Sequence, residues 1–267
     1  MPREAHRVAF SNNKGGAAKT TWCKEIAASL ARRGRDVLVI DMDPQANLTR
    51  RMGVVEDPDN PRPTVSEAIK ADQAGCIADV IVPCGWDDKT AARIDVVPSR
   101  IDLETRVSEA ALLGSVLRLR TALGDQTDDY DWVLIDCAPS MGHLTHLALA
   151  ASDAVLVPVV PEYDHVVGGK RMVEFIADYR VMLHSPDLEV IGVLVGGLRS
   201  NTALHSFHVG GLGEVFGDIV WDPFIPHRIA IAEAQDRATP VHAVPVLNRE
   251  VGWIYDSISD RLEKALS

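Results

Sequence analysis

The feature that most constrains this chain is the segment Asn12–Thr21, which reads NNKGGAAKTT. A short apolar run, Arg7–Ser11, precedes it, and an amphipathic stretch, Thr20–Arg33, follows it. This order predicts a strand, a glycine-containing turn and the N-terminus of a helix. In such a turn, successive backbone N–H groups and the helix dipole converge on an anion, most often a phosphate. The segment therefore predicts a nucleotide phosphate loop.

Two lysines lie in this segment, on either side of its glycines. Lys19 stands at the start of the predicted helix, where it is expected to reach the β- and γ-phosphates, and the Thr20 hydroxyl is expected to ligate Mg²⁺. Lys14 precedes the glycines, which sets this loop apart from other phosphate loops. The other residues expected to contact the nucleotide here are Gly15, Gly16, Ala17, Ala18 and Thr21.

The loop departs from the usual pattern G-x-x-x-x-G-K-[ST], because Asn13 and Ala18 stand at its two glycine positions. Glycine before the lysine lets the backbone approach a phosphate without a Cβ in the way. Ala18 is therefore expected to change nucleotide affinity. Taken alone, the segment is also compatible with a polar strand-to-helix turn that binds nothing.

Two further segments favour the phosphate loop. Asp36–Gln45 and Trp132–Ser140 each read as a buried parallel strand, the first ending in two carboxylates and the second in one aspartate. Ligands of open α/β sheets bind at the carboxyl ends of the strands, so we expect Asp41, Asp43 and Asp136 to lie near the loop. Acidic groups at this place indicate a bound cation, and Asp136 is expected to hold Mg²⁺ through water.

The remainder of the chain predicts a single α/β domain spanning residues 1–267. With 267 residues, 46% of them hydrophobic, the chain can bury a sizeable core. Apolar strand-like runs alternate with helical patterns, which favours a mostly parallel, twisted sheet with helices on both faces. The predicted strands are residues 7–12, 36–41, 93–98, 131–136, 154–159 and 189–196.

Four segments together identify a family: Lys14–Thr21, Asp41–Gln45, Val96–Leu103 and Ile135–Ser140. The chain resembles the ParA/Soj partition ATPases, within the deviant Walker A group of P-loop NTPases that also contains MinD and the nitrogenase iron protein. The resemblance covers essentially the whole chain. Near its end, the segments similar to the family's base-side loop and following helix are Ile225–Pro226, Glu233–Ala234 and Pro240–Val241.

The resemblance implies a homodimer in the ATP state, with Mg²⁺ at each site. Lys14 matches the lysine that crosses to the partner's nucleotide, and with Lys19 and Asp43 it would carry the catalysis. Asp43 matches the residue that positions or activates the attacking water. Asp41 matches a metal-side carboxylate, beside Thr20 and Asp136. Pro226 is the base-side candidate.

The function implied by the resemblance is DNA partition. Slow hydrolysis of ATP to ADP and phosphate, stimulated by a ParB-like centromere-binding protein, would release the dimer from nonspecific DNA. The formal net charge is −11, so DNA binding requires basic side chains that gather on one face. The candidates are Lys170, Arg171, Arg199, Arg228 and Arg249, with Arg50 and Arg51 as a second possibility.

Two other functions stay open. The first is a positioning ATPase whose cargo is a chemoreceptor array, a microcompartment or a division regulator. The second is a nucleotide-binding switch with negligible hydrolysis, which Ala18 would permit. Only about ten residues precede the loop, so we expect no N-terminal helix-turn-helix domain and no sequence-specific operator binding.

No targeting segment is predicted, and a cytoplasmic, nucleoid-associated protein is expected. No run approaches the roughly 18 apolar residues of a membrane span, and the N-terminus lacks an apolar signal core. The C-terminal segment 251–266 has apolar residues at 254, 258, 262 and 266, which predicts a core-facing helix. Its polar face carries acidic residues rather than a basic set, which disfavours a membrane anchor.

Overall fold

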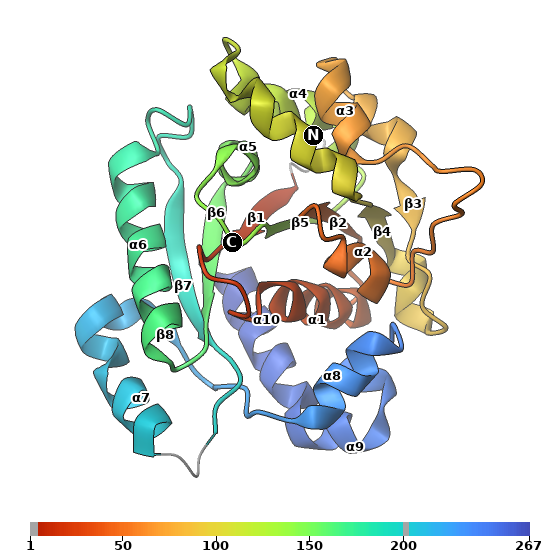
Figure 1. Cartoon of the computed structure of the whole chain (residues 1–267). Helices are drawn as coiled ribbons and strands as arrows, with labels where there is room; N and C mark the ends of the chain where they lie inside the picture. The colour runs from red at the N-terminus through yellow and green to blue at the C-terminus, as the bar shows by residue number, and fades with distance from the viewer. Residues whose placement is uncertain (1–4, 200–202) are drawn as a thin grey trace.

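The computed structural model describes residues 5–199 and 203–267. In this part of the chain an eight-stranded sheet has the order β3-β4-β2-β5-β1-β6-β7-β8 (Figure 1). Its neighbouring strands are parallel except for β3 and β4, which are antiparallel. The strands are β1 (His6–Phe10), β2 (Val37–Met42), β3 (Val82–Pro83), β4 (Ile94–Val97), β5 (Trp132–Cys137), β6 (Ala154–Val159), β7 (Glu189–Val195) and β8 (Val220–Trp221).

The predicted fold class is confirmed, and each of the six predicted strands is present within two residues of its expected ends. The two edge strands, β3 and β8, lie outside the predicted strands. Each has only two residues, too few to show the alternation by which a strand is recognised. In β3 one of the two is Pro83, a residue that sheets tolerate at their edges.

Helices cover both faces of the sheet (Figure 1). The α-helices are α1 (Lys19–Arg32), α2 (Asn47–Arg51), α3 (Val65–Ala71), α4 (Arg118–Leu123), α5 (His143–Ala150), α6 (Tyr163–Tyr179), α7 (Ala203–Phe216), α8 (Ile229–Asp236), α9 (Pro245–Leu247) and α10 (Trp253–Ala265). Among the described residues, none of these helices combines the length and the apolar character that crossing a bilayer requires.

The core has two halves, separated by the sheet. Along β2, Leu38 and Ile40 pack with α3, α4, α5 and α6, whereas Val37 and Val39 pack with α1, α2 and α10. Successive side chains of a strand point to opposite faces, so one continuous apolar strand supplies both halves. This two-sided burial holds the strand ends, and the loops after them, in fixed positions.

The C-terminal helix faces the core, as its sequence predicts. In α10, Ile254, Ile258 and Leu262 are buried in the half of the core that contains α1, and Leu266 just beyond it is partly buried. Ion pairs also join the end of α1 to the polar side of α10. They link Arg32 with Asp256, and both Arg33 and Arg35 with Glu263.

Candidate nucleotide site

The loop and the acidic strand ends meet at one edge of the sheet. β1, which leads into the loop, lies between β5 and β6, and β5 in turn pairs with β2. Asp41 at the end of β2 is the register partner of Asp136 at the end of β5. Asp136 is in turn the register partner of Phe10, the last residue of β1. The parallel register therefore brings Asp41 and Asp136 beside the loop, as their sequence positions predict.

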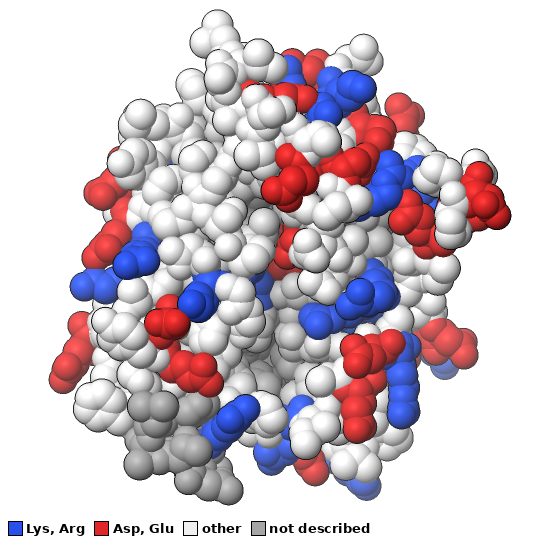
Figure 2. All heavy atoms as spheres, viewed as in Figure 1, with Lys and Arg blue, Asp and Glu red and all other residues white. Residues whose placement is uncertain are grey.

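A cavity of about 600 Å³ opens at this edge. Its lining includes the loop residues Gly15–Thr21, Asp43 and Pro226. Figure 2 shows the molecule hollowed near the centre of this face. The volume is within the range of typical small-molecule pockets, roughly 300–1,000 Å³. The cavity can therefore accommodate a ligand of nucleotide size.

The backbone of the loop is shaped for an anion, although one residue is strained. Gly16 and Ala18 are both left-handed, with φ of 77° and 67°. Ala18 is also the N-cap of α1 and makes no side-chain hydrogen bond to it. The first N–H groups of α1 therefore lack a side-chain cap and remain available to an anion. A left-handed alanine costs roughly 1–2 kcal/mol, whereas glycine would adopt this conformation freely.

We predict that Ala18→Gly stabilises the protein by about 0.5–1 kcal/mol, because the relief of strain exceeds the extra chain entropy of glycine. Urea unfolding measures this difference. Ala238→Gly is the matched control, since Ala238 is also left-handed, with φ of 48°, and lies outside the cavity. Stabilisation by Ala238→Gly but not by Ala18→Gly would contradict the assignment of strain to the loop.

The two lysines of the loop have different surroundings. Lys19 is buried and lines the cavity, and its Nζ donates a hydrogen bond to the carbonyl oxygen of Lys14, 3.1 Å away. Burial lowers the pKa of Lys19, while the nearby carboxylate of Asp136 acts in the opposite direction. Lys14 is outside the cavity lining, with 46% of its side chain exposed, and its Nζ lies 2.9 Å from Oδ2 of Asp164 in α6.

Thr20 and Asp136 fit a metal site. The hydroxyl of Thr20 donates to Oδ2 of Asp136 over 2.7 Å, while Oδ1 of Asp136 is buried and has no hydrogen-bond partner. Burial, followed by the neighbouring charge of Asp41, raises the pKa of Asp136 to about 8. Among the described residues no group of three or more His, Cys, Asp or Glu could hold a metal alone. Mg²⁺ commonly takes one or two carboxylates together with phosphate oxygens, which this arrangement suits.

The raised pKa of Asp136 predicts the pH dependence of stability without metal. Between the ordinary carboxyl pKa, about 4, and the folded value, the native state binds the extra proton, so its stability falls as pH rises. Asp136→Asn should therefore be more stable than the parent at pH 9 by at least about 1 kcal/mol, and close to it near pH 4. Urea unfolding at both pH values without Mg²⁺ tests this. If the free energy of unfolding of the parent rose relative to that of Asp136→Asn as pH rises, the raised pKa of Asp136 would be contradicted.

The other two strand-end carboxylates hold the turn after β2. Asp41 is buried and accepts hydrogen bonds from the backbone and hydroxyl of Thr49, both 2.8 Å long, and from the Asp43 N–H. Burial raises the pKa of Asp41 to about 6. Asp43 accepts from the N–H of Gln45 and lines the cavity. Of these two carboxylates Asp43 is the one that lines the cavity, and the roles of Asp41 at the metal and of Asp43 in hydrolysis both stay predictions.

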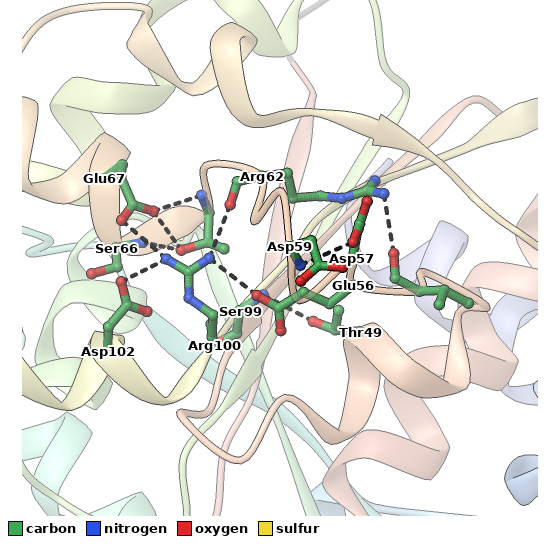
Figure 3. Close-up of polar contacts among 12 residues, drawn as sticks. Thr49, Glu56, Asp57, Asp59, Arg62, Ser66, Glu67, Ser99, Arg100 and Asp102 are labelled. Carbon is green, nitrogen blue, oxygen red and sulfur yellow. Dashed lines mark hydrogen bonds and ion pairs between the residues drawn. The ribbon is translucent and has the colours of Figure 1, made fainter.

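A polar network continues from this turn to the loop after β4 (Figure 3). The Thr49 hydroxyl accepts from the N–H of Ser99, and the next residue, Arg100, bridges three carboxylates. These belong to Glu56, Glu67 and Asp102. Within Val96–Leu103, Ser99 therefore fastens the start of α2, and Arg100 fastens the loop that follows it.

The cavity is also lined by aromatic and amide side chains that the sequence did not indicate. Trp22 and Tyr255 line it with their rings in edge contact, 5.4 Å between centroids. Gln235 donates a hydrogen bond to the hydroxyl of Thr21, which fastens α8 to the start of α1. Pro226, the predicted base-side residue, lines the same region. No spacing in the sequence relates these residues, because they come from distant elements.

The five candidate DNA-binding residues do not lie on one element. Lys170 and Arg171 are exposed on α6, Arg249 is exposed before α10, and Arg199 and Arg228 line the cavity. Arg228 also forms an ion pair with Glu250, 3.0 Å long. On the face in Figure 2, basic and acidic side chains are interspersed. The DNA contacts therefore stay a prediction.

Comparison with known proteins identifies the family. A family model described as an AAA domain (AAA_31) matches residues 5–190. The sporulation initiation inhibitor protein Soj of Bacillus subtilis is 32% identical over 244 residues, covering 88% of this chain and 89% of Soj. The chromosome partitioning protein ParA of Myxococcus xanthus is 33% identical over 238 residues, covering 88% and 80%. The chain belongs to the ParA/Soj family. This confirms the resemblance stated from its motifs.

Solved structures of other proteins have a fold similar to that of this ParA/Soj-family chain. The ATP complex of a Cyanothece McdA variant superposes with a TM-score of 0.83 over 98% of this chain and 96% of McdA. At 19% identity that likeness shows the fold alone. Cobyrinic acid a,c-diamide synthase from Mycobacterium smegmatis, solved with an ATP analogue and magnesium, is 29% identical, with a TM-score of 0.74 over 93% and 97% of the chains.

Proposed function

We propose that this chain is a slow, partner-stimulated ATPase that binds Mg-ATP in the cavity and pairs with a second copy in the ATP state. The placement of the two lysines carries the proposal. Lys19 is buried beside the loop, where it would meet the phosphates of its own nucleotide. Lys14 belongs to the same loop but is half exposed and outside the cavity lining. A lysine in that position can reach the phosphate of a nucleotide held by a facing copy.

The side chains around the cavity support hydrolysis. Mg²⁺, when bound beside Thr20 and Asp136, would neutralise charge on the phosphate oxygens. Lys19 would hold the β- and γ-phosphates, and Lys14 of the second copy would add a positive charge in trans. Asp43 would position the attacking water and accept its proton, giving ADP and phosphate.

We further propose DNA partition as the biological role, with a ParB-like protein stimulating hydrolysis on nonspecific DNA. Relatives at 32–33% identity with the names Soj and chromosome partitioning protein ParA support this role. A positioning ATPase with a non-DNA cargo is the second candidate. The net charge of −11 and the mixed surface of Figure 2 favour it, because DNA binding depends on the number of phosphates neutralised.

ATP-dependent DNA binding across a range of salt concentrations tests the partition role. With Mg-ATP the chain should retain random-sequence duplex DNA at low salt and lose it steeply as salt rises, because phosphate contacts release counterions. With Mg-ADP it should bind weakly. If the protein bound DNA equally weakly with Mg-ATP and with Mg-ADP, the DNA partition role would be contradicted and a non-DNA cargo would be favoured.

A further inference from the structure

The start of α6 lies directly against the phosphate loop. Nε2 of His165 is 3.0 Å from the carbonyl oxygen of Gly15, and the side-chain amide of Asn12 donates to the His165 carbonyl over 3.2 Å. One turn further along, a Cβ on Gly168 would lie 2.6 Å from Oδ1 of both Asn12 and Asn13. Glycine at 168 therefore allows the helix to approach the loop this closely.

The contact of His165 determines which way one peptide of the loop faces. A carbonyl oxygen only accepts, so Nε2 of His165 must carry the proton and donate it to Gly15. Because the peptide group is planar and trans, fixing the Gly15 carbonyl toward α6 turns the N–H of Gly16 the opposite way. Gly16 lines the cavity and is left-handed, with φ of 77°. The nearest atom that a Cβ on Gly16 would meet is Nε2 of His165, at 3.6 Å, so the ring also lies against this residue.

We propose that His165 is a positioning residue, which holds the Gly15–Gly16 peptide in the orientation that binds phosphate. The inference depends on the proposed binding of Mg-ATP at this loop. This loop has a particular need for such support, because Asn13 and Ala18 occupy the positions where glycine is usual and Ala18 is strained. The hydrogen bond from α6 offsets part of the cost of keeping the loop in shape.

The surroundings of the ring agree with this role. Only 13% of the His165 side chain is exposed, and it also lines the cavity. Its second nitrogen, Nδ1, is buried without a hydrogen bond and lies 3.6 Å from Oε2 of Glu162. The ring of His165 is partly buried, and the hydrogen bond that the structure shows for it runs to the loop. The loop therefore orients the ring, and the ring orients the loop.

Two substitutions of His165 separate positioning from general stability. His165→Ala should weaken Mg-ATP binding about 10-fold in calorimetry, the order expected when one hydrogen bond that shapes the site is lost. His165→Gln, whose amide can donate from a similar distance, should restore affinity to within about 3-fold. Asp178→Ala, on an exposed position of the same helix, is the control and should bind as the parent does.

Turnover adds a second readout. This hydrogen bond acts on the loop rather than on the reacting atoms, so we expect it to contribute equally before and during hydrolysis. His165→Ala should therefore raise KM about 10-fold with kcat changed by less than about 2-fold. Parent-like affinity in His165→Ala, equal losses in His165→Ala and His165→Gln, or a fall in kcat at constant KM would each overturn the inference while leaving the proposed function intact. A parent that takes up no Mg-ATP would overturn both.

Discussion

Lys19→Ala should abolish measurable Mg-ATP binding. The Lys19 side chain is buried at the start of α1 and lines the cavity, so it would place a positive charge against a bound phosphate that alanine cannot supply. Removing one partner of a buried, charge-assisted hydrogen bond costs about 3 kcal/mol or more, which corresponds to at least about 100-fold in affinity. Calorimetric titration with Mg-ATP gives the dissociation constant directly.

Two controls separate lost binding from lost folding. Lys19 also donates to the Lys14 carbonyl, so the loop could relax in the variant. Urea unfolding without nucleotide should show that Lys19→Ala remains cooperatively folded. Lys264→Ala, on an exposed position of α10, removes one positive charge far from the loop in sequence and should bind as the parent does. If the affinity of Lys19→Ala for Mg-ATP were within a few-fold of the parent's, the proposal that the phosphates bind beside Lys19 would be refuted.

Asp43→Ala should retain Mg-ATP but lose hydrolysis. Asp43 lines the cavity, whereas both oxygens of its neighbour Asp41 already accept hydrogen bonds from the turn. Removing a residue that accepts a proton in the transition state typically costs 10²- to 10⁴-fold in rate. The variant should therefore accumulate the ATP-bound form, which phosphate release and nucleotide retention on a spin column both measure.

Asp43→Asn is the matched control for the shape of the turn. Its side-chain oxygen can still accept from the N–H of Gln45, as Oδ1 of Asp43 does at 3.0 Å, but it cannot take a proton. Loss of turnover in both variants would assign the effect to the carboxylate. If Asp43→Asn turned over at the parent rate while Asp43→Ala did not, the residue would act through the turn alone, and rapid turnover in both would exclude it from hydrolysis.

Much of this fold was predictable because the determining patterns are local. β2 and β5 are uninterrupted apolar runs that end in aspartate, and parallel pairing then brings Asp41 and Asp136 together. The loop is recognisable from the composition of Lys14–Thr21 and the apolar strand before it. The C-terminal helix shows its buried stripe by spacing alone, with Ile258 at its centre.

The parts that were not predictable depend on tertiary contacts. No sequence pattern joins His165 to Gly15, which lie 150 residues apart, or Gln235 to Thr21. Nor does the sequence distinguish Arg228, which lines the cavity, from Arg171, which is exposed on α6. The packing of the helices and strands determines whether an arginine lies at the cavity or on the outer surface. The residue type alone therefore does not show whether it contacts DNA or a nucleotide.

Light scattering of Asp43→Ala with saturating Mg-ATP tests the central claim most directly. The account predicts twice the mass of a single chain with Mg-ATP and a single chain with Mg-ADP. The double variant Asp43→Ala with Lys14→Ala should still bind Mg-ATP, but its measured mass should be that of a single chain. Adding Asp164→Ala, which breaks the same 2.9 Å ion pair but keeps the lysine, should preserve the dimer. A Mg-ATP-loaded protein that stays single, or a dimer indifferent to Lys14, would contradict the account.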